Sequence, residues 1–316
     1  MNVGDGASET GAPTERIKPV LTMQEFVRRY VPDGQQLLIG GFAFNDPAAL
    51  AHEIIRQRRR DLFVMKTSGG VLVDQLVGAE CVTRLLSCHV WNSVGPVPAH
   101  CFRRALEQGK PHRLQIEELS YGAFTMSLMA GACGLPFMPT TPVQGAGHFT
   151  QRTLMPEKFG VVASPFGGEP VCVVPPLTPE LGVFHVQRVD QFGNAQMFGP
   201  TGEMRYAMAA CKKLLVIAEE MVDTALIRER PEATVAPGFM VEAVVIEPWA
   251  AHPTDAFGYY WRDLEHNSLY GEMSRTEAGF QQYIDEWITG TANHAEFIAK
   301  LGSNRLAELQ SRKDTW

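Results

Sequence analysis

Short apolar runs alternate with amphipathic stretches along most of the chain. The first clear run, 37–39, ends in paired glycines, and after Pro47 apolar residues recur at helical spacing. Repeated along the sequence, this pattern predicts strands at 36–42, 61–66, 81–90, 112–119, 170–175, 181–189, 213–218 and 240–247. It predicts helices between them at 47–59, 71–79, 98–108, 121–133 and 201–211. Because strands that alternate with helices build a mainly parallel sheet covered by helices, the sequence predicts an α/β fold.

Four regions depart from this alternation. Residues 134–180 are rich in proline and glycine and are predicted to form loops over the rigid scaffold. The turn at 190–194 indicates a short antiparallel element. The end of the chain predicts a helical C-terminal tail, with helices at about 274–288, 293–301 and 303–311. The polar start of the chain predicts a disordered lead-in over 1–20, followed by a single domain over 21–316.

Composition narrows the class of protein. The 316 residues carry a net charge of −7, and the basic residues gather only at 56–60, at the end of a predicted helix, which argues against nucleic-acid binding. No apolar stretch reaches the length of about 18 residues that a membrane span needs. The six cysteines are dispersed without CxxC pairs, which suits free thiols in the cytoplasm. An HExxH-like string at His52 lacks its second histidine, so no metal site is predicted.

Candidate chemistry lies where the predicted strands end, because open α/β sheets bind ligands beyond the carboxyl ends of their strands. Paired glycines there let backbone approach a ligand closely, although such junctions also occur in most α/β proteins. Glu118 ends an apolar-alternating strand, which suits either a cavity-facing acid or base, or a carboxylate in solvent. The 144–147 loop either presents amides to an oxyanion or is a plain turn. The candidate residues at or just after the predicted strand ends are Gly40, Gly41, Phe42, Ser68, Asn92, Ser93, Glu117, Glu118, Glu219 and Glu220.

Residues 33–47, which read DGQQLLIGGFAFNDP, are similar to the first signature of the family I CoA-transferase α chains. Further matching strings follow in order at 92–93, 102–104, 109–110, 134–139, 144–147, 218–220, 251–253, 301–302 and 305–306. On these strings the chain resembles the α subunits of family I CoA-transferases, of the glutaconate CoA-transferase type, from about residue 21 to 309. One departure is the short spacing between Phe42 and Pro47, which lacks the usual glycine and suggests a loop shaped for a different acyl group.

This resemblance implies a NagB/RpiA/CoA-transferase-like fold and an enzyme of paired α and β chains. CoA moves from an acyl-CoA to a free carboxylic acid through a glutamyl-CoA intermediate, with coenzyme A as a substrate moiety and no permanently bound cofactor. The nucleophilic glutamate lies in an S-E-N-G motif of the β chain, and this chain contains no Glu-Asn-Gly, so it needs a β partner. The implied contribution of this chain is substrate binding by Gly40, Gly41, Phe42, Ser68, Asn92, Ser93, Gln144, Gly145 and Gly147, with Glu118 as a catalytic candidate.

Two alternatives stay open at this point. Some two-chain relatives resemble transferases but open the ring of a cyclic acyl-CoA, as in steroid degradation, and there a glutamate in the region of Glu118 is the important residue. The strings at 134–147 and 251–253 favour the transferase. An effector-binding regulator of similar fold would need a DNA-binding helix-turn-helix module, for which the short lead-in leaves no room.

Overall fold

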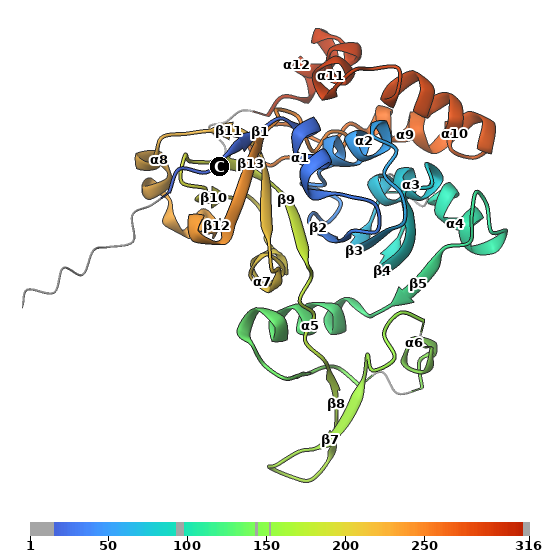
Figure 1. Cartoon of the computed structure of the whole chain (residues 1–316), viewed down its shortest axis with the longest axis vertical. Coiled ribbons are helices and arrows are strands. Elements are labelled where there is room, and N and C mark those ends of the chain that lie inside the picture. The colour runs from blue at the N-terminus through green and yellow to red at the C-terminus, as the bar shows by residue number, and fades with distance from the viewer. Residues whose placement is uncertain (1–15, 93–97, 143–144, 152, 312–316) are drawn as a thin grey trace, which may run out of the picture.

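One sheet with eight parallel strands organises the chain in the computed structural model, which describes residues 16–92, 98–142, 145–151 and 153–311. The strand order is β1-β13-β11-β9-β2-β3-β4-β5, and every neighbouring pair on this path is parallel (Figure 1). These strands are β1 (Val20–Leu21), β2 (Gln36–Ile39), β3 (Leu62–Gly69), β4 (Val82–Val90), β5 (Gln115–Glu118), β9 (Leu181–Val189), β11 (Leu214–Met221) and β13 (Val241–Ile246). The predicted α/β class with a mainly parallel sheet is therefore confirmed.

Helices cover both faces of the sheet. One face carries α1 (Met23–Tyr30), α2 (Ala48–Arg56), α3 (Val71–Gly78) and α4 (His100–Glu107). On the same side, outside α2 and α3, lie α9 (Leu264–Met273) and α10 (Glu277–Tyr283), which continues as a π-helical turn at Ile284–Ile288. The other face carries α5 (Tyr121–Cys133) and α7 (Met204–Ala210). The remaining helices are α8 (Thr224–Glu229), α11 (His294–Leu301) and α12 (Ser303–Leu309). No helix within the described ranges is long and apolar enough to cross a membrane.

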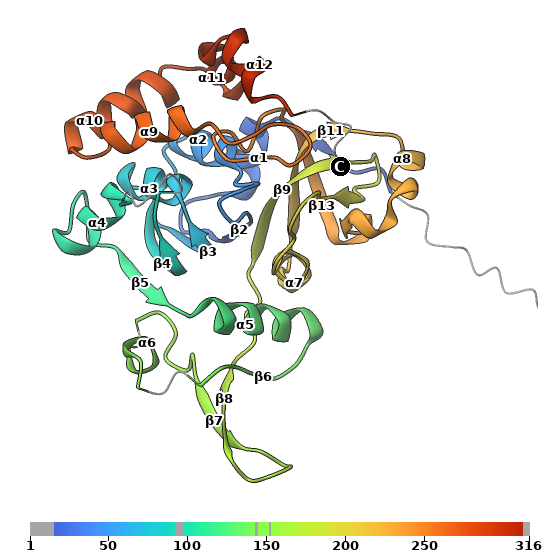
Figure 2. The ribbon, with the colours of Figure 1, turned by 180° about the vertical axis from the view of Figure 1, so that it is seen from behind.

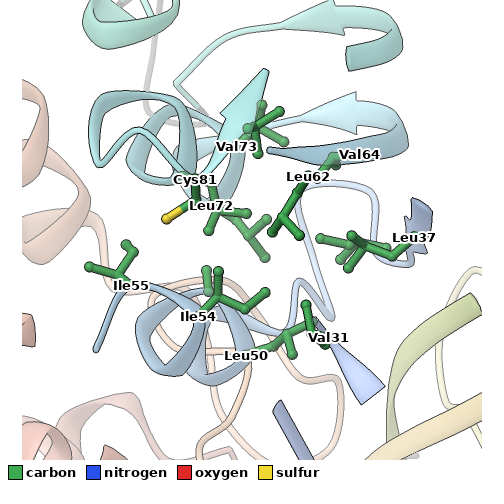
Figure 3. Packing of buried hydrophobic residues seen from close by; sticks show 14 of the residues in the cluster. Val31, Leu37, Leu50, Ile54, Ile55, Leu62, Val64, Leu72, Val73 and Cys81 are labelled. Atoms are coloured by element: carbon green, nitrogen blue, oxygen red, sulfur yellow. The ribbon is translucent and has the colours of Figure 1, made fainter. Parts of the chain in front are cut away.

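The larger core lies between the sheet and the α2–α3 layer. Leu50, Ile54 and Ile55 of α2 belong to one buried cluster with Leu62 and Val64 of β3, in which Leu50 lies beside Val31 (Figure 3). All of residues 48–55 are buried, because α11 covers the side of α2 that faces away from the sheet, where the Phe297 ring lies 4.7 Å from the His52 ring. The four C-terminal helices thus complete the fold as a third layer over α2 and α3 (Figures 1 and 2).

The described residues between 138 and 174 form an arm that projects from the body of the molecule beyond α5 (Figures 1 and 2). Its antiparallel sheet consists of β6 (Met138–Pro139), β8 (Pro170–Val174) and β7 (Gly160–Ala163), and α6 (Gly147–Thr150) lies in the same segment. The buried Glu117 carboxylate anchors the arm by accepting hydrogen bonds from the amides of 153–155 at 2.7, 2.8 and 3.1 Å. Of this small sheet the sequence predicted only the strand 170–175, because β6 has two residues and a proline.

Element boundaries explain the other differences from the sequence predictions. The strand predicted at 36–42 ends at Ile39, where the glycines turn the chain toward α2. The predicted boundary between residues 20 and 21 falls inside β1, whose Val20 pairs with Val244. The antiparallel element predicted near 190–194 is confirmed by β10 (Ala195–Gln196), which pairs with β9 and with β12 (Thr234–Ala236). Residues 1–15 of the predicted lead-in lie outside the described residues.

Candidate active site

The carboxyl ends of β2, β3 and β4 bring the predicted site residues to one edge of the sheet. Gly40 and Gly41 follow β2, and Ser68 lies near the end of β3, directly opposite His89 of β4. Asn92 follows β4 and is 3% exposed. Glu118 ends β5 and pairs with Ser87 of β4. The edge therefore carries backbone amides, hydroxyls and a carboxylate within one region.

The buried side chain of Lys66 holds the loop of Gly40 and Gly41 in place. Its buried ammonium donates to the carbonyl oxygens of Gly40 and Gly41 at 2.7 and 2.8 Å and to the Asp46 carboxylate at 2.9 Å. Burial raises the pKa of Asp46, and the adjacent Lys66 charge opposes this rise. Since all three bonds are withdrawn from solvent, the loop is held as a rigid turn rather than as a flexible lid.

Both glycines are required by the packing of the loop itself. A Cβ at Gly40 would overlap the Phe184 ring. Gly41 has φ +95°, and a Cβ there would overlap the Asp46 carboxylate. The sequence interpretation placed the need for glycine in the approach of a ligand, whereas the structure supplies an internal reason for it.

The short connection from Phe42 to Pro47 is locked by the C-terminal part of the chain. Ala43 and Asn45 have φ of 58° and 51°, a left-handed conformation that non-glycine residues rarely adopt. The Asn45 amide donates to the Asp255 carbonyl at 2.8 Å, and Arg262 contacts both the Ala43 carbonyl and the Asp255 carboxylate. These contacts hold the turn in its strained backbone conformation. The glycine that the family signature usually has in this connection would relieve that strain.

The amide of Gly41 has only a weak partner. It donates to the Met204 sulfur at 3.5 Å, and a thioether is a poor hydrogen-bond acceptor. An oxyanion placed at this position would be a much stronger acceptor. The geometry therefore supplies one preorganised amide donor at the carboxyl edge.

Phe42 is the centre of a group of four side chains that we call the Phe42 cluster: Phe42, Ser68, His89 and Tyr121. The Phe42 ring packs edge-on against His89 at 6.0 Å and against Tyr121 at 5.4 Å between centroids. Ser68 Oγ lies 2.9 Å from His89 Nε2. Desolvation lowers the pKa of His89, so its imidazole is neutral at pH 7. Since His89 and Tyr121 are exposed, the cluster is open to an incoming molecule.

A buried carboxylate lies behind this cluster. Glu203 is 2% exposed and accepts hydrogen bonds from the Tyr121 hydroxyl at 2.7 Å and from the Thr67 hydroxyl. None of the ion pairs among the described residues includes Glu203. Burial raises the pKa of the Cys88 thiol to about 12, and the charges of Glu203 and Glu118 reinforce this shift. Both carboxylates therefore lie near Cys88.

At the end of β5 the two glutamates have opposite environments. Glu117 is buried, and although burial favours a raised pKa, Lys158 and the three arm amides hold the pKa of Glu117 below its usual value. Glu118, the sequence candidate for an acid or base, has an exposed side chain in this chain rather than a cavity-facing one. It remains placed at the carboxyl edge beside Cys88.

The other predicted site residues divide into three groups. Ser93 and Gln144 lie outside the described residues. Gly145 and Gly147 are exposed at the start of α6, on the arm, and a Cβ at either would meet no atom within 4 Å. Glu219 is buried and engaged by His185 at 2.7 Å and Tyr260 at 2.5 Å, which makes it part of the scaffold.

Sequence reasoning missed Lys66, His89, Tyr121 and Glu203. Lys66 had a usable signal, because a lysine within an apolar strand must find a buried partner. Glu203 had none, since its partners Thr67 and Tyr121 lie far from it in sequence. No group of three or more His, Cys, Asp or Glu side chains suited to a metal ion occurs in the described part of the chain.

Comparisons with known proteins agree on one family. A family model described as Coenzyme A transferase matches residues 20–247. The chain is 34% identical over 286 residues to the A-type subunit of 3-oxoadipate CoA-transferase from Pseudomonas knackmussii, covering 90% of this chain and 99% of that protein. It is 31% identical over 304 residues to the A-type subunit of glutaconate CoA-transferase from Acidaminococcus fermentans, covering 92% and 94%.

Solved structures and a second kind of relative complete the comparison. The crystal structure of the A. fermentans glutaconate CoA-transferase matches with a TM-score of 0.85 and 30% identity, over 93% of this chain and 96% of that one. A cholesterol ring-cleaving hydrolase IpdA subunit of Mycobacterium tuberculosis is 28% identical over 268 residues, covering 82% of this chain and 89% of that protein.

Proposed function

Because the chain belongs to the coenzyme A transferase family, as a subunit of the A type, we propose that it is the α subunit of a two-chain enzyme that moves CoA from an acyl-CoA to a free carboxylic acid. The resemblance drawn from the signature strings is confirmed at the level of the family. The proposal adds a ping-pong route through a glutamyl-CoA thioester, with the nucleophilic glutamate on the β chain.

The observation that carries this proposal is the fixed glycine loop. Its Gly41 amide has the buried Met204 sulfur as its acceptor and belongs to the loop that carries Phe42 of the Phe42 cluster. In the proposed reaction the partner's carboxylate attacks the thioester carbonyl, and the oxyanion that forms accepts a hydrogen bond from this amide. Collapse expels the CoA thiolate and leaves an acyl-glutamyl anhydride.

The CoA thiolate then attacks the glutamyl carbonyl of the anhydride. This releases the first carboxylic acid and forms the glutamyl-CoA thioester, which a second carboxylic acid converts back by the reverse steps. Coenzyme A is therefore a substrate moiety, and the proposal includes no resident cofactor. All six cysteines are free, which suits a reducing compartment, and a cytoplasmic location stays a prediction.

The test is to trap the intermediate. The assembled complex is incubated with acyl-CoA, treated with borohydride or hydroxylamine, and analysed by mass spectrometry. We expect a modified glutamate on the β chain, and we expect Glu118→Gln in this chain to leave its formation intact. Absence of any adduct at a glutamate in a complex that exchanges CoA would contradict the covalent route.

The second candidate function is a ring-opening hydrolase that acts on a cyclic acyl-CoA. The exposed position of Glu118 at the carboxyl edge favours it, because a solvent-accessible carboxylate there suits acid–base chemistry on a bound thioester. In that case Glu118→Gln would lower turnover by about 10²–10⁴-fold, the usual contribution of an acid or base, and no adduct would form.

A further inference from the structure

The charges around the Phe42 cluster point to the kind of acyl group that it accepts. Resting on the proposed CoA transfer, we infer that the acyl group bound at this cluster is uncharged, and that Glu203 is a specificity-determining residue that rejects acyl groups ending in a second carboxylate. The CoA-transferase relatives named above carry the names of two dicarboxylic acids, 3-oxoadipate and glutaconate. This chain would therefore differ from them in substrate class.

The hydrogen bonds of Tyr121 leave no donor for a second carboxylate. Its hydroxyl hydrogen is directed to Glu203, 2.7 Å away, so that only oxygen lone pairs and the ring face remain for a ligand. At His89, Nε2 and the Ser68 hydroxyl are engaged with each other at 2.9 Å, and whichever of them donates, one uncharged donor of the pair, Nδ1–H or the hydroxyl, is left for a ligand. The Phe42 cluster thus presents a neutral, largely aromatic surface.

The described cations near this edge are occupied elsewhere. Lys66 is buried against Asp46 and the two glycine carbonyls. Lys158 contacts the Glu117 carboxylate and donates to the Glu118 carbonyl at 3.1 Å. Arg262 is paired with Asp255 at 2.8 Å. None of the three is available to neutralise a second negative charge at the Phe42 cluster.

The nearest charges are negative. Glu203 accepts a hydrogen bond from the Tyr121 hydroxyl, and the charges of Glu203 and Glu118 both act on the Cys88 thiol. Two like charges separated by little more than the Tyr121 hydroxyl repel each other strongly when partly withdrawn from water, and we expect a discrimination of roughly tenfold to hundredfold. An uncharged acyl group of the same length escapes this repulsion.

A matched pair of thioesters tests the inference on the complex assembled with its β partner. Hexanoyl-CoA and adipoyl-CoA have the same six-carbon chain, and only adipoyl-CoA ends in a second carboxylate. We expect kcat/KM, with acetate as acceptor, to favour hexanoyl-CoA by at least tenfold. We expect Glu203→Gln to bring this ratio toward one, because it removes the charge and retains an acceptor for Tyr121. Glu229→Gln, on exposed α8, should keep the wild-type ratio.

A second variant covers the case in which Glu203→Gln does not assemble. Tyr121→Phe removes the hydroxyl between Glu203 and the ligand, and since Tyr121 is 40% exposed the fold should tolerate it. The preference for hexanoyl-CoA should then increase severalfold. Tyr206→Phe, which removes a hydroxyl from a side chain of 39% exposure on α7, is the control and should leave the preference unchanged.

Measuring the binding of the two thioesters distinguishes a failure of this inference from a failure of the proposed function. If the complex exchanges CoA with neither thioester, the proposed transfer is wrong, and the ratio of the two dissociation constants, measured by calorimetry, still reports the charge preference. The inference is overturned if wild-type complex prefers adipoyl-CoA or treats the two equally. It is also overturned if neither Glu203→Gln nor Tyr121→Phe, once assembled, changes the ratio.

Discussion

Lys66 shows how one buried charge determines the geometry of a whole loop. Its three hydrogen bonds go to Gly40, Gly41 and Asp46, so the amide of Gly41 has its orientation set by a side chain of the neighbouring strand. The signature glycines alone predict a turn at this point. They do not reveal the lysine beneath it, because the contact joins two strands whose spatial relation the sequence does not display.

Replacing Lys66 by methionine should be strongly destabilising. The substitution leaves the Asp46 carboxylate buried without its cation, and breaking a buried pair typically costs about 3–5 kcal/mol. Urea unfolding of Lys66→Met measures this loss. The double variant Lys66→Met with Asp46→Asn should recover a large part of it, since the orphaned charge is gone. Simple additivity of the two single losses would show that the pair is not coupled.

Gly41→Ala should lower turnover at least a hundredfold in the assembled enzyme. The alanine methyl group is strained at φ +95° and displaces Asp46, so the amide leaves the position from which it would donate to the proposed oxyanion. Loss of one such donor typically costs about 2.7–4 kcal/mol of transition-state stabilisation. Steady-state kinetics and size-exclusion chromatography measure turnover and assembly.

Gly122→Ala is the matched control for this change. Gly122 lies in α5, has open space around it and no left-handed backbone, so alanine is tolerated there. A Gly41→Ala enzyme that works at the control's rate would show that the loop serves only the fold.

At the scale of elements, the helices were predictable where their buried side chains are apolar. The helices predicted at 47–59 and 121–133 lie close to the observed α2 and α5, in which the buried residues are largely apolar. Helix α9 was missed, because its buried face consists of polar and aromatic residues, among them His266, Asn267 and Tyr270. A hydrophobic period is not visible in such a segment. The side-chain network that stabilises it becomes apparent only in three dimensions.

The third layer buries four histidines, which makes its stability depend on pH. His52, His252, His266 and His294 lie between α2 and the C-terminal segment, and desolvation lowers the pKa of each, to about 3 for His266 and His294. Neither ring nitrogen of His52 has a hydrogen-bond partner. These imidazoles are therefore neutral in the folded protein.

Acidification should destabilise the protein through this group. In the unfolded chain the histidines titrate near pH 6.5, so below that pH the unfolded state binds more protons and the free energy of unfolding falls. We expect the melting temperature to be highest above pH 7 and to fall steadily from pH 6.5 toward pH 4. His52→Leu should reduce the slope in calorimetric scans across this range. A slope that His52→Leu leaves unchanged would assign the acid sensitivity to other groups.

At the scale of the whole molecule, the alternation of strands and helices predicted the parallel sheet but not the order of its strands. The strands β2, β3, β4 and β5 follow one another both in the sequence and in the sheet. The chain then passes through α5 and the arm, and β9 pairs with the other side of β2. Apart from the strand at 170–175, the arm was interpreted as loops, because its strands are short and its proline and glycine content is high. Local sequence patterns do not show which strands pair when the strands lie this far apart in the sequence.

Because this chain lacks the nucleophile motif, we predict that CoA exchange requires the assembled enzyme. The isolated chain should show no exchange of CoA between acyl-CoA and acetate, and mixing it with a β chain that carries S-E-N-G should restore exchange. The assay follows labelled acetate into the thioester pool at matched protein concentrations. Turnover by the rigorously purified single chain would contradict the need for a partner.

The position of β2 between β3 and β9 also bears on how the chain is made. Leu37 and Leu38 pair with β3 early, but the β9 partners of 37–39, which are Leu181, Gly182 and Val183, leave the ribosome about 140 residues later. At a synthesis rate of about 5–20 residues per second, this edge waits for roughly 7–30 s without its partner. During that interval one edge of the largely buried strand β2 is open to pairing with other chains. We therefore expect the nascent chain to be a target for chaperone binding until β9 has left the ribosome.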